Sequence, residues 1–385
     1  MTFRTVPLSV VHLKTCPEGG AIQKRRRERQ NPKSSSSDLG RHSGYESEAY
    51  TVPCDPRDFT LRMPKYINLH SESPDGTDPS SRVTVQNSTL MPHFKLTIAY
   101  DGTPYYGWQV QPNLPTVQGV LSDVIFRAIR ERVLPQGSGR TDSGVHALAQ
   151  VASFSLKAPI PPERLQLTLN RCLPPSIRII STEVVSPTFH ARHSAIGKTY
   201  EYRIFPLRQT EATQIPNKFA KSHSPVPDAI CPPTLAPFVW PCPWPLNLDH
   251  LNRAARHVIG THDFTSFAAA DPDLTARGEP LHLIPTDASI ALTQERAAAA
   301  RTPVRTITQS EWTVADGLFL YRVTANGFLH HMVRNLVGAF VQAGSARIDP
   351  DSIPGLIAAR NRSLCGPTAP ASGLFLLSVE YSDNC

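Results

Sequence analysis

The chain has 385 residues, 40% hydrophobic and 18% charged, which is enough for two or three domains with a sizeable core. Its net charge of +7 and pI near 9.1 favour a polyanionic partner without identifying one. The seven cysteines form no CxxC pair, and no apolar run reaches the length of a membrane span. These features argue against a disulfide scaffold, a zinc site and a membrane protein, and they predict a cytoplasmic location.

Residues 1–90 differ in composition from the rest of the chain. They contain a basic run at 24–27, a serine run at 34–37, and isolated glycine, proline and charged residues without a sustained period. This composition is typical of disorder. The basic run is compatible with a nuclear signal or an RNA-binding arm, but a solvated run of charge is the simpler interpretation. We expect residues 1–90 to be a disordered extension, or an upstream misassignment of the start codon with Met91 as the true first residue.

The ordered pattern begins at Phe94. Apolar residues alternate from Phe94 to Tyr100, which predicts a half-buried strand. Apolar positions from Val117 to Ala128 then follow a helical period, with Thr116 as the predicted N-cap. Further strands are predicted at 150–156, 177–185 and 199–205, and a short helix is predicted after the prolines at 161 and 162.

The second half of the chain repeats this pattern. Helical stripes lie at 251–259 and 329–340, and strands are predicted at 310–314, 318–325 and 374–381. Two stretches without an apolar period, near 206–247 (rich in proline) and near 271–306, are predicted to be surface insertions. Alternating strands combined with amphipathic helices indicate an α+β fold, in which a mostly antiparallel sheet carries helices on one face.

The segment GRTDSGVHA, residues 139–147, is the most informative motif. Glycines at 139 and 144 permit a tight turn that presents Asp142 and Arg140 together. An aspartate in such a turn is usually only a turn-forming residue, so the turn by itself does not identify a site.

The whole nonapeptide, however, closely resembles the active-site loop of the TruA family of tRNA pseudouridine synthases, with Ser143 where that family usually has alanine. Four other segments match the same family in the same order, and the resemblance spans about residues 94–381. These segments are YDGTPYYGWQVQ (100–111), FHARHSAIGKTYEYRI (189–204), DFTSF (263–267) and ANGFLHHMVRNLVG (325–338). The resemblance implies two ferredoxin-like halves, residues 91–188 and 189–385, that form one extended sheet with a catalytic cleft between them.

The resemblance also assigns roles to individual residues. Asp142 is expected to be the catalytic carboxylate, kept ionised by Arg334 from the C-terminal helix. Tyr200, in the Lys198-Thr199-Tyr200 motif, is expected to contact the target base, although packing within a strand explains it almost as well. Arg140 is expected to assist flipping of the uridine out of its stem.

Several other polar residues invite a functional interpretation. We interpret His146 as a loop-stabilising hydrogen-bonder, because the reaction needs no imidazole. His330 and His331 suggest a metal site, but no carboxylate or cysteine accompanies them at ligand spacing, so we predict no metal. Polar and aromatic residues of the 100–111 segment fit an RNA-facing surface or cleft rim, with core packing expected for one of them. They are Asp101, Tyr105, Tyr106, Gln109 and, as the core residue, Trp108.

The resemblance therefore implies an isomerase that converts uridine to pseudouridine in the anticodon stem-loop of tRNA, at positions 38–40, as a homodimer. No electrons or groups are gained in this reaction, so no cofactor is expected. The alternatives are a synthase of the same family with another RNA target, and an RNA-binding relative without catalysis. A nucleoside hydrolase that uses a lone aspartate would need metal-binding carboxylates, which the motifs lack.

Overall fold

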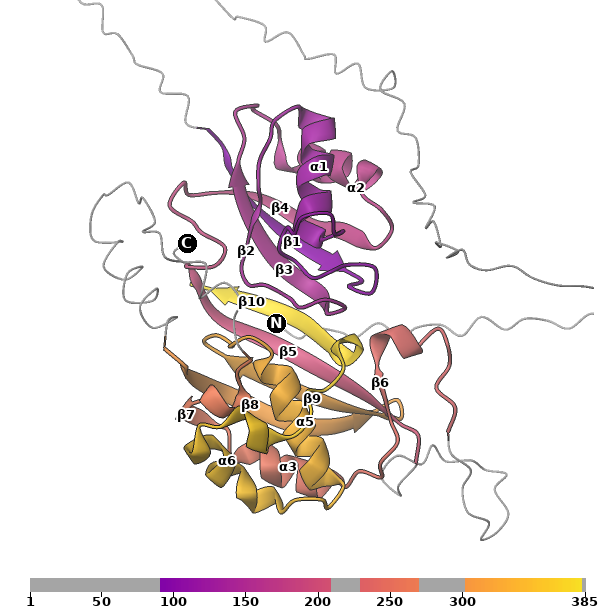
Figure 1. Cartoon of the computed structure of the whole chain (residues 1–385). Coiled ribbons are helices and arrows are strands. Elements are labelled where there is room, and N and C mark those ends of the chain that lie inside the picture. Colours follow the sequence, from indigo (N-terminus) through magenta and orange to yellow (C-terminus); the bar gives the residue numbers. More distant parts are fainter. Residues whose placement is uncertain (1–90, 209–228, 270–301, 383–385) are drawn as a thin grey trace, which may run out of the picture. The chain divides into compact units, whose positions relative to one another are not determined.

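The computed structural model describes residues 91–208, 229–269 and 302–382 (Figure 1). All described residues belong to one of the two units into which the chain divides, Tyr66–Cys385. The predicted N-terminal extension, about half of the predicted insertion near 206–247 and most of that near 271–306 lie outside the described residues. In the part of the chain that is described, no helix is both long and apolar enough to cross a membrane.

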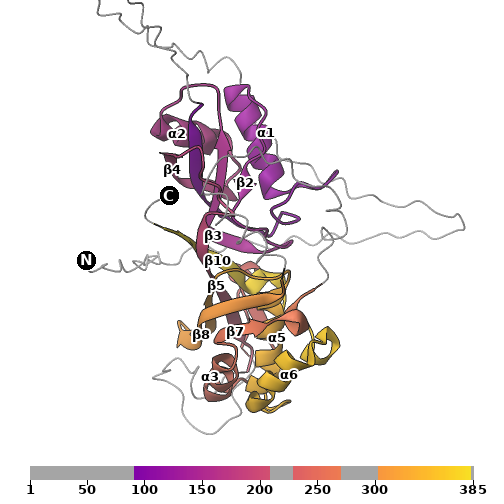
Figure 2. The same ribbon diagram turned by 90° about the vertical axis from the view of Figure 1, so that its left-hand side faces the viewer.

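A ten-stranded, mostly antiparallel sheet organises the second unit. Its main path runs β4-β1-β3-β10-β5-β9-β8-β7, while β2 pairs with β3 and β6 pairs with β5. In the figures, α1 and α2 lie beside β1–β4, whereas α3, α5 and α6 gather against β5 and β7–β9 (Figures 1 and 2). This arrangement confirms the predicted α+β class.

The first half of the sheet follows the sequence pattern closely. Its apolar alternation buries every second residue of β1, and the Thr116 side chain caps α1 by accepting from the backbone N–H of Gly119. The strand predicted at 150–156 begins four residues earlier, because His146 and Ala147 already pair with neighbouring strands. The elements are β1 (His93–Tyr100), α1 (Val117–Ile129), β2 (Gln136–Gly137), β3 (His146–Ser155), α2 (Pro162–Cys172) and β4 (Ile177–Val185).

The second half contains the longer strands and the most buried helix. Its elements are β5 (Ala195–Pro206), β6 (Trp240–Cys242), α3 (Leu248–Arg256), β7 (Gly260–Asp263), β8 (Val304–Ala315), β9 (Leu318–Ala325), α5 (Met332–Gly344), α6 (Ile353–Ala359) and β10 (Leu374–Tyr381).

Two details differ from the sequence pattern in this half. The helix predicted from residue 329 begins at Met332, because the backbone of His331 is left-handed, with φ of 60°. Within the proline-rich stretch predicted to be an insertion, β6 pairs in parallel with the end of β5, so this part extends the sheet.

The last strand, β10, joins the two halves. It runs parallel to β3, through Phe375 opposite His146 and Leu376 opposite Ala147, and antiparallel to β5 over most of its length. The loop that precedes β3 is thereby brought next to β5 and α5. The motif segments meet at this junction.

Candidate active site

The loop that carries Asp142 connects β2 to β3 and is fixed at its start by buried polar groups. The Ser138 hydroxyl donates to Gln150 Oε1 at 2.7 Å, and Gln150 Nε2 donates to the Gly139 carbonyl at 2.9 Å. The Thr141 hydroxyl lies 2.8 Å from that of Tyr100. These contacts leave little freedom for the backbone immediately before Asp142.

A turn then presents the Asp142 carboxylate. The Val145 N–H donates to the Asp142 carbonyl at 3.1 Å, and Gly144 has φ of 78°, which is the left-handed conformation that the glycine of this motif predicts. The Asp142 side chain is partly exposed, with 18% of it accessible. The carboxylate can therefore meet a ligand while its backbone is held.

The 100–111 segment packs against the back of this loop. Gly107, at φ of 83°, approaches so closely that a Cβ there would lie 2.5 Å from the Thr141 carbonyl. Trp108 is buried as expected, but Tyr105 is buried too, and its hydroxyl lies 2.7 Å from that of Ser176. Tyr106 is half exposed, so it remains a candidate for an RNA-facing position.

Arg334 of α5 meets Asp142 directly. Its Nη1 donates to Asp142 Oδ2 at 3.1 Å, and its Nε donates to the Ala369 carbonyl at 2.8 Å. The Ala369 N–H returns a bond to the Arg334 carbonyl, so the guanidinium is held between α5 and the segment that leads to β10. The predicted partners, 192 positions apart in the sequence, form a charge-assisted hydrogen bond.

A buried polar network fixes that segment against α5. The fully buried Asn335 accepts from Arg362 Nη2 at 2.9 Å and from the Thr368 hydroxyl at 2.7 Å, and it donates to the Phe267 carbonyl. Buried groups satisfied in this way hold one geometry firmly. The network therefore helps to fix the backbone of the neighbouring Arg334.

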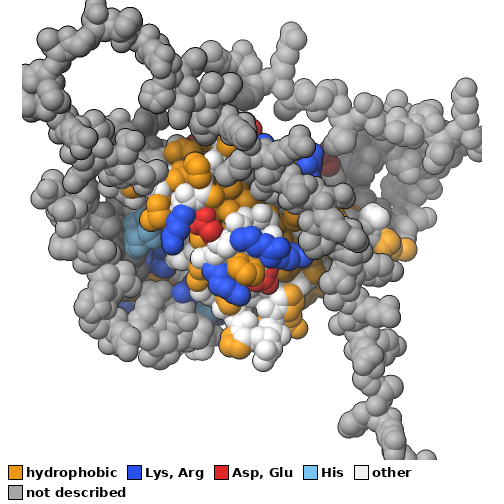
Figure 3. Space-filling view, turned by 90° about the horizontal axis from the view of Figure 1, so that it is seen from above, with side chains coloured by type: hydrophobic (Ala, Val, Ile, Leu, Met, Phe, Trp, Pro, Cys, Tyr) orange, Lys and Arg blue, Asp and Glu red, His pale blue; other side chains and the backbone are white. Residues whose placement is uncertain are grey.

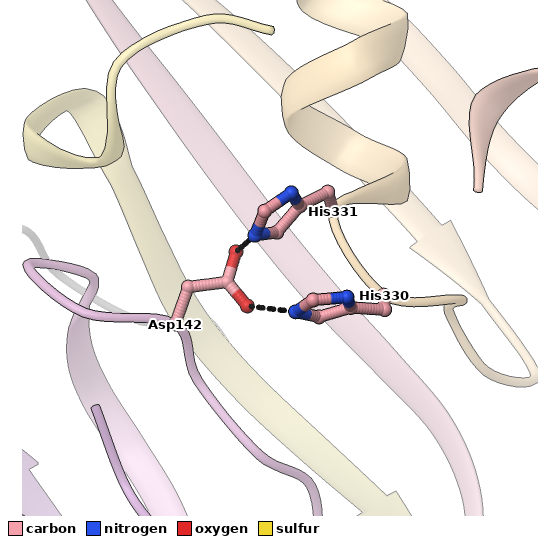
Figure 4. Close-up of side chains that lie close together, drawn as sticks. All are labelled: Asp142, His330 and His331. Atoms are coloured by element: carbon pink, nitrogen blue, oxygen red, sulfur yellow. Dashed lines mark ion pairs between the residues drawn. The ribbon is translucent and has the colours of Figure 1, made fainter. Parts of the chain in front are cut away.

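Two imidazoles complete the surroundings of the carboxylate (Figure 4). His330 Nε2 lies 3.5 Å from Asp142 Oδ1, and His331 Nε2 lies 3.4 Å from Asp142 Oδ2. Burial lowers the pKa of His331, the Asp142 charge opposes that shift, and the neighbouring His330 and Arg334 reinforce it. His331 is also the N-cap residue of α5, so the positive end of that helix faces the carboxylate.

Tyr200 lies on β5 with its ring edge-on to Phe328, at a centroid distance of 5.0 Å. Burial raises the pKa of Tyr200 well above its usual range, and the nearby Tyr100 and Asp142 raise it further. The phenol is therefore un-ionised at neutral pH. Its neighbour Tyr202 instead donates to the Pro370 carbonyl at 2.7 Å, as a structural tyrosine does.

Cationic side chains border the site. Arg140 is exposed on the same loop as Asp142. The Lys198 ammonium donates to the Ser138 carbonyl at 2.6 Å, and burial, together with the charges of Arg192 and Arg305, lowers the pKa of Lys198 to about 8. Lys198 and Tyr200 are two residues apart in β5, so both side chains lie on the same face of the strand.

The structure thus joins Asp142 and Arg334 as predicted, with Tyr200 close enough for the Asp142 charge to raise its pKa. His146, at the start of β3, is a hydrogen-bonding residue as expected, and its bonds tie the end of the loop to other segments: its Nδ1 accepts from the Gly102 N–H, and Nε2 lies 3.1 Å from the Pro237 carbonyl. Sequence reasoning missed the contact of His330 and His331 with Asp142. The adjacent histidines were the visible signal, but the carboxylate that accompanies them comes from the other half of the chain.

An α+β protein with an arginine-bound aspartate on a loop between two half-sheets matches a known class. The family model described as tRNA pseudouridine synthase matches residues 96–194 and 288–382, and the chain belongs to this family. It is 41% identical over 292 residues to tRNA pseudouridine synthase A of Solibacter usitatus, covering 76% of this chain and all of that protein. The corresponding protein of Moorella thermoacetica is 40% identical over 294 residues, again covering 76% of this chain and the whole of the relative. That of Bacillus pumilus is 37% identical over 295 residues, covering 75% of this chain and 99% of the relative.

Proposed function

We propose that this protein isomerises uridine to pseudouridine in tRNA, with Asp142 as the catalytic carboxylate. Membership of the tRNA pseudouridine synthase family supports the reaction. The observation that carries the residue assignment is the contact between Asp142 Oδ2 and Arg334 Nη1, because it holds a charged carboxylate at the mouth of a fixed loop.

The reaction breaks the bond between uracil N1 and the ribose, turns the base, and rejoins it through C5. An ionised carboxylate beside C1′ and C2′ can act as nucleophile or base, and Asp142 supplies one. Arg334 orients that carboxylate through its hydrogen bond. In this proposal the Tyr200 ring contacts the uracil, and Arg140, which is exposed on the same loop, holds the backbone of the flipped nucleotide.

The raised pKa of Tyr200 bears on one of these roles. An un-ionised phenol is a poor base, so the Tyr200 hydroxyl serves better as a hydrogen-bonding group for the base than as the first acceptor of the C5 proton. This favours stacking and orientation over proton removal for Tyr200.

The finer parts of the proposal are the target and the assembly. We assign the anticodon stem-loop, positions 38–40, as the substrate region, and a cytoplasmic homodimer as the working form. On the face seen in Figure 3, Lys and Arg side chains alternate with apolar and acidic ones. Two subunits would bring two such surfaces to one polyanion, which compensates for the modest charge of each.

The first test replaces Asp142 by Asn, which keeps the shape of the side chain and removes its charge. Pseudouridine formation in unmodified tRNA should fall by more than a thousandfold, while the melting temperature and tRNA affinity stay close to wild type. Turnover within tenfold of wild type, about 1.4 kcal/mol of barrier, would contradict the assignment.

The target is tested separately by chemical mapping of pseudouridine in tRNA from cells with and without the gene. Loss of the modification at positions 38–40 supports the anticodon assignment. Loss at other positions, or in another RNA, would identify a relative with a different target. No loss anywhere, together with tRNA binding by the purified protein, would identify an RNA-binding relative without catalysis.

A further inference from the structure

Three potential metal ligands converge at the candidate active site. We propose that Asp142, His330 and His331 form a binding site for Zn²⁺, and that occupation of this site inhibits the enzyme. The proposed metal binding rests on the geometry of the three side chains, whereas the proposed inhibition rests on the proposed role of Asp142. The donor atoms of the three residues lie within 4.8 Å of one another (Figure 4).

The spacing of the donor atoms suits a tetrahedral ion. Zinc bound by imidazole nitrogen and carboxylate oxygen at about 2.0–2.1 Å places neighbouring ligand atoms roughly 3.3 Å apart. His330 Nε2 lies 3.5 Å from Oδ1 and His331 Nε2 lies 3.4 Å from Oδ2, and one donor atom from each residue lies within 4.8 Å of the others. Because the two contacts involve different oxygens, the carboxylate must rotate or the rings must move to bring one oxygen and both nitrogens onto three corners of a tetrahedron.

The three ligand side chains are held in place by the fold and are accessible from solvent. Asp142 is fixed by its loop, and His331 is fixed by its left-handed backbone at the start of α5. Between 18% and 32% of each side chain is exposed, so an ion can enter from solvent and retain a water molecule at its fourth position. Two imidazoles and one carboxylate with an open fourth corner are a common donor set for zinc.

Arg334 opposes the ion and makes its binding weaker than that of a permanent cofactor. Its guanidinium lies 3.1 Å from Asp142 Oδ2, so a dication on the same carboxylate experiences an adjacent positive charge. Removal of this charge should therefore tighten metal binding, although Arg334 is not a ligand. Zinc bound nonspecifically elsewhere on the surface would not bind more tightly when the Arg334 charge is removed.

Occupation would remove the group on which the reaction depends. A carboxylate that has donated a lone pair to Zn²⁺ is a weaker nucleophile and base, and the ion fills the space in front of Asp142. The bound metal and the flipped uridine would compete, so inhibition should diminish as the tRNA concentration rises.

The binding test uses metal-free full-length protein titrated with Zn²⁺ by calorimetry and with Co²⁺ by visible absorption. Wild type should bind one ion with a tetrahedral cobalt spectrum that lacks a thiolate charge-transfer band. His330→Gln, His331→Asn and Asp142→Asn should each weaken binding at least tenfold, and Arg334→Met should strengthen it. Asparagine is chosen at 331 because it tolerates the left-handed backbone.

The matched control is His193→Gln. His193 belongs to a second pair of neighbouring imidazoles, with its ring 4.3 Å from that of His190, and this pair lies outside the three-ligand cluster. Its replacement should leave the affinity unchanged. Circular dichroism checks the fold of every variant, and the cobalt spectrum of wild type reports the ligand set independently of any variant. A thiolate band, or equal affinity in wild type and the ligand variants, would overturn the proposed site.

The activity arm follows pseudouridine formation at zinc concentrations that fill the site. Wild type should lose at least nine-tenths of its activity, recover it after addition of EDTA, and resist inhibition at high tRNA concentration. If zinc binds at these ligands but activity is unaffected, the proposed inhibition is wrong and the proposed metal site is retained. If the metal-free protein forms no pseudouridine, the proposed function fails and the binding result is untouched.

Discussion

At the scale of single residues, the surroundings of Asp142 set what its carboxylate can do. One oxygen accepts from Arg334, and an imidazole lies near each of the two oxygens. The guanidinium places a positive charge beside the carboxylate, and the two imidazoles place ring nitrogens beside it. A nucleotide that reaches Asp142 therefore meets a charged group whose position is set from two halves of the sheet.

Replacement of Tyr200 by Phe separates the ring of this residue from its hydroxyl. The stacking surface remains, so tRNA affinity should stay within about threefold of wild type. Turnover should fall about tenfold or more if the hydroxyl orients the base, which corresponds to ~1.4 kcal/mol in the barrier. Because the phenol is un-ionised, the wild-type rate should show no rise that depends on Tyr200 between pH 7 and 9.

Release of tritium from C5-labelled tRNA distinguishes the two roles of Tyr200. If C5 release alone is slowed in Tyr200→Phe while cleavage of the original glycosidic bond proceeds normally, Tyr200 handles the C5 proton. If both steps slow together, it orients the base. Unchanged kinetics would leave only a packing role.

At the scale of elements, the catalytic loop depends on the glycine-bearing segment behind it. Gly107→Ala would force a left-handed conformation on a side chain and push its Cβ against the Thr141 carbonyl. We expect the variant to lose about 2 kcal/mol of stability and most of its activity, because the loop must move. The measurements are urea unfolding and single-turnover pseudouridine formation.

Gly355→Ala provides the control. Gly355 lies in α6, and a Cβ there would meet no atom within 4 Å. Alanine at this position should stabilise the protein by up to about 1 kcal/mol and leave activity unchanged. Equal behaviour of the two variants would show that Gly107 is not a constraint on the loop.

The elements also show what periodicity can and cannot predict. The helix from residue 117 follows from apolar spacing because it buries one face, and the strands at 177–185 and 374–381 match their predicted bounds. The start of α5 could not be predicted in this way, since the apolar stripe continues through Leu329 while the backbone turns at His331. The short β6 and β7 carry too few residues to show a period.

Some contacts of the candidate site could likewise be predicted from the sequence, and others could not. Asp142 and Arg334 were predicted because each lies in a motif with a known pairing. His330 and His331 approach Asp142 only because of the way in which the two halves of the sheet meet. Residue spacing within either segment cannot predict this contact.

At the scale of the whole molecule, a partly buried histidine makes stability depend on pH. His190 Nδ1 accepts from the N–H groups of Arg192 and His193, and burial, together with the charges of His193 and Arg192, lowers the pKa of His190 to about 4. Between this value and the usual 6.5, the unfolded chain binds more protons than the folded one. Stability should therefore fall as the pH is lowered through this window.

His190→Asn isolates this contribution, because its oxygen can accept the same bonds and does not titrate. The variant should lose less stability than wild type between pH 6.5 and 4.5, by on the order of 1 kcal/mol given the partial exposure of the ring. Denaturant unfolding across the pH range measures the difference. Parallel curves for the two proteins would contradict the role of His190.

The N-terminal 90 residues can be tested by removal. They carry 13 basic and 10 acidic residues, so they add little to the charge that phosphates would meet. A chain that starts at Met91 should keep its melting temperature and nearly all of its activity on tRNA. Insolubility, or a loss of tRNA affinity of more than about tenfold, would show that the segment belongs to the functional protein.

The position of β10 makes the two halves depend on one strand. β10 pairs with β3 on one side and with β5 on the other, and the segment that bonds Arg334 directly precedes it. A change that detaches β10 would therefore remove the strand that both halves share and, with it, the support of the Arg334 guanidinium. Damage at this single strand would reach a carboxylate that lies in the other half of the chain.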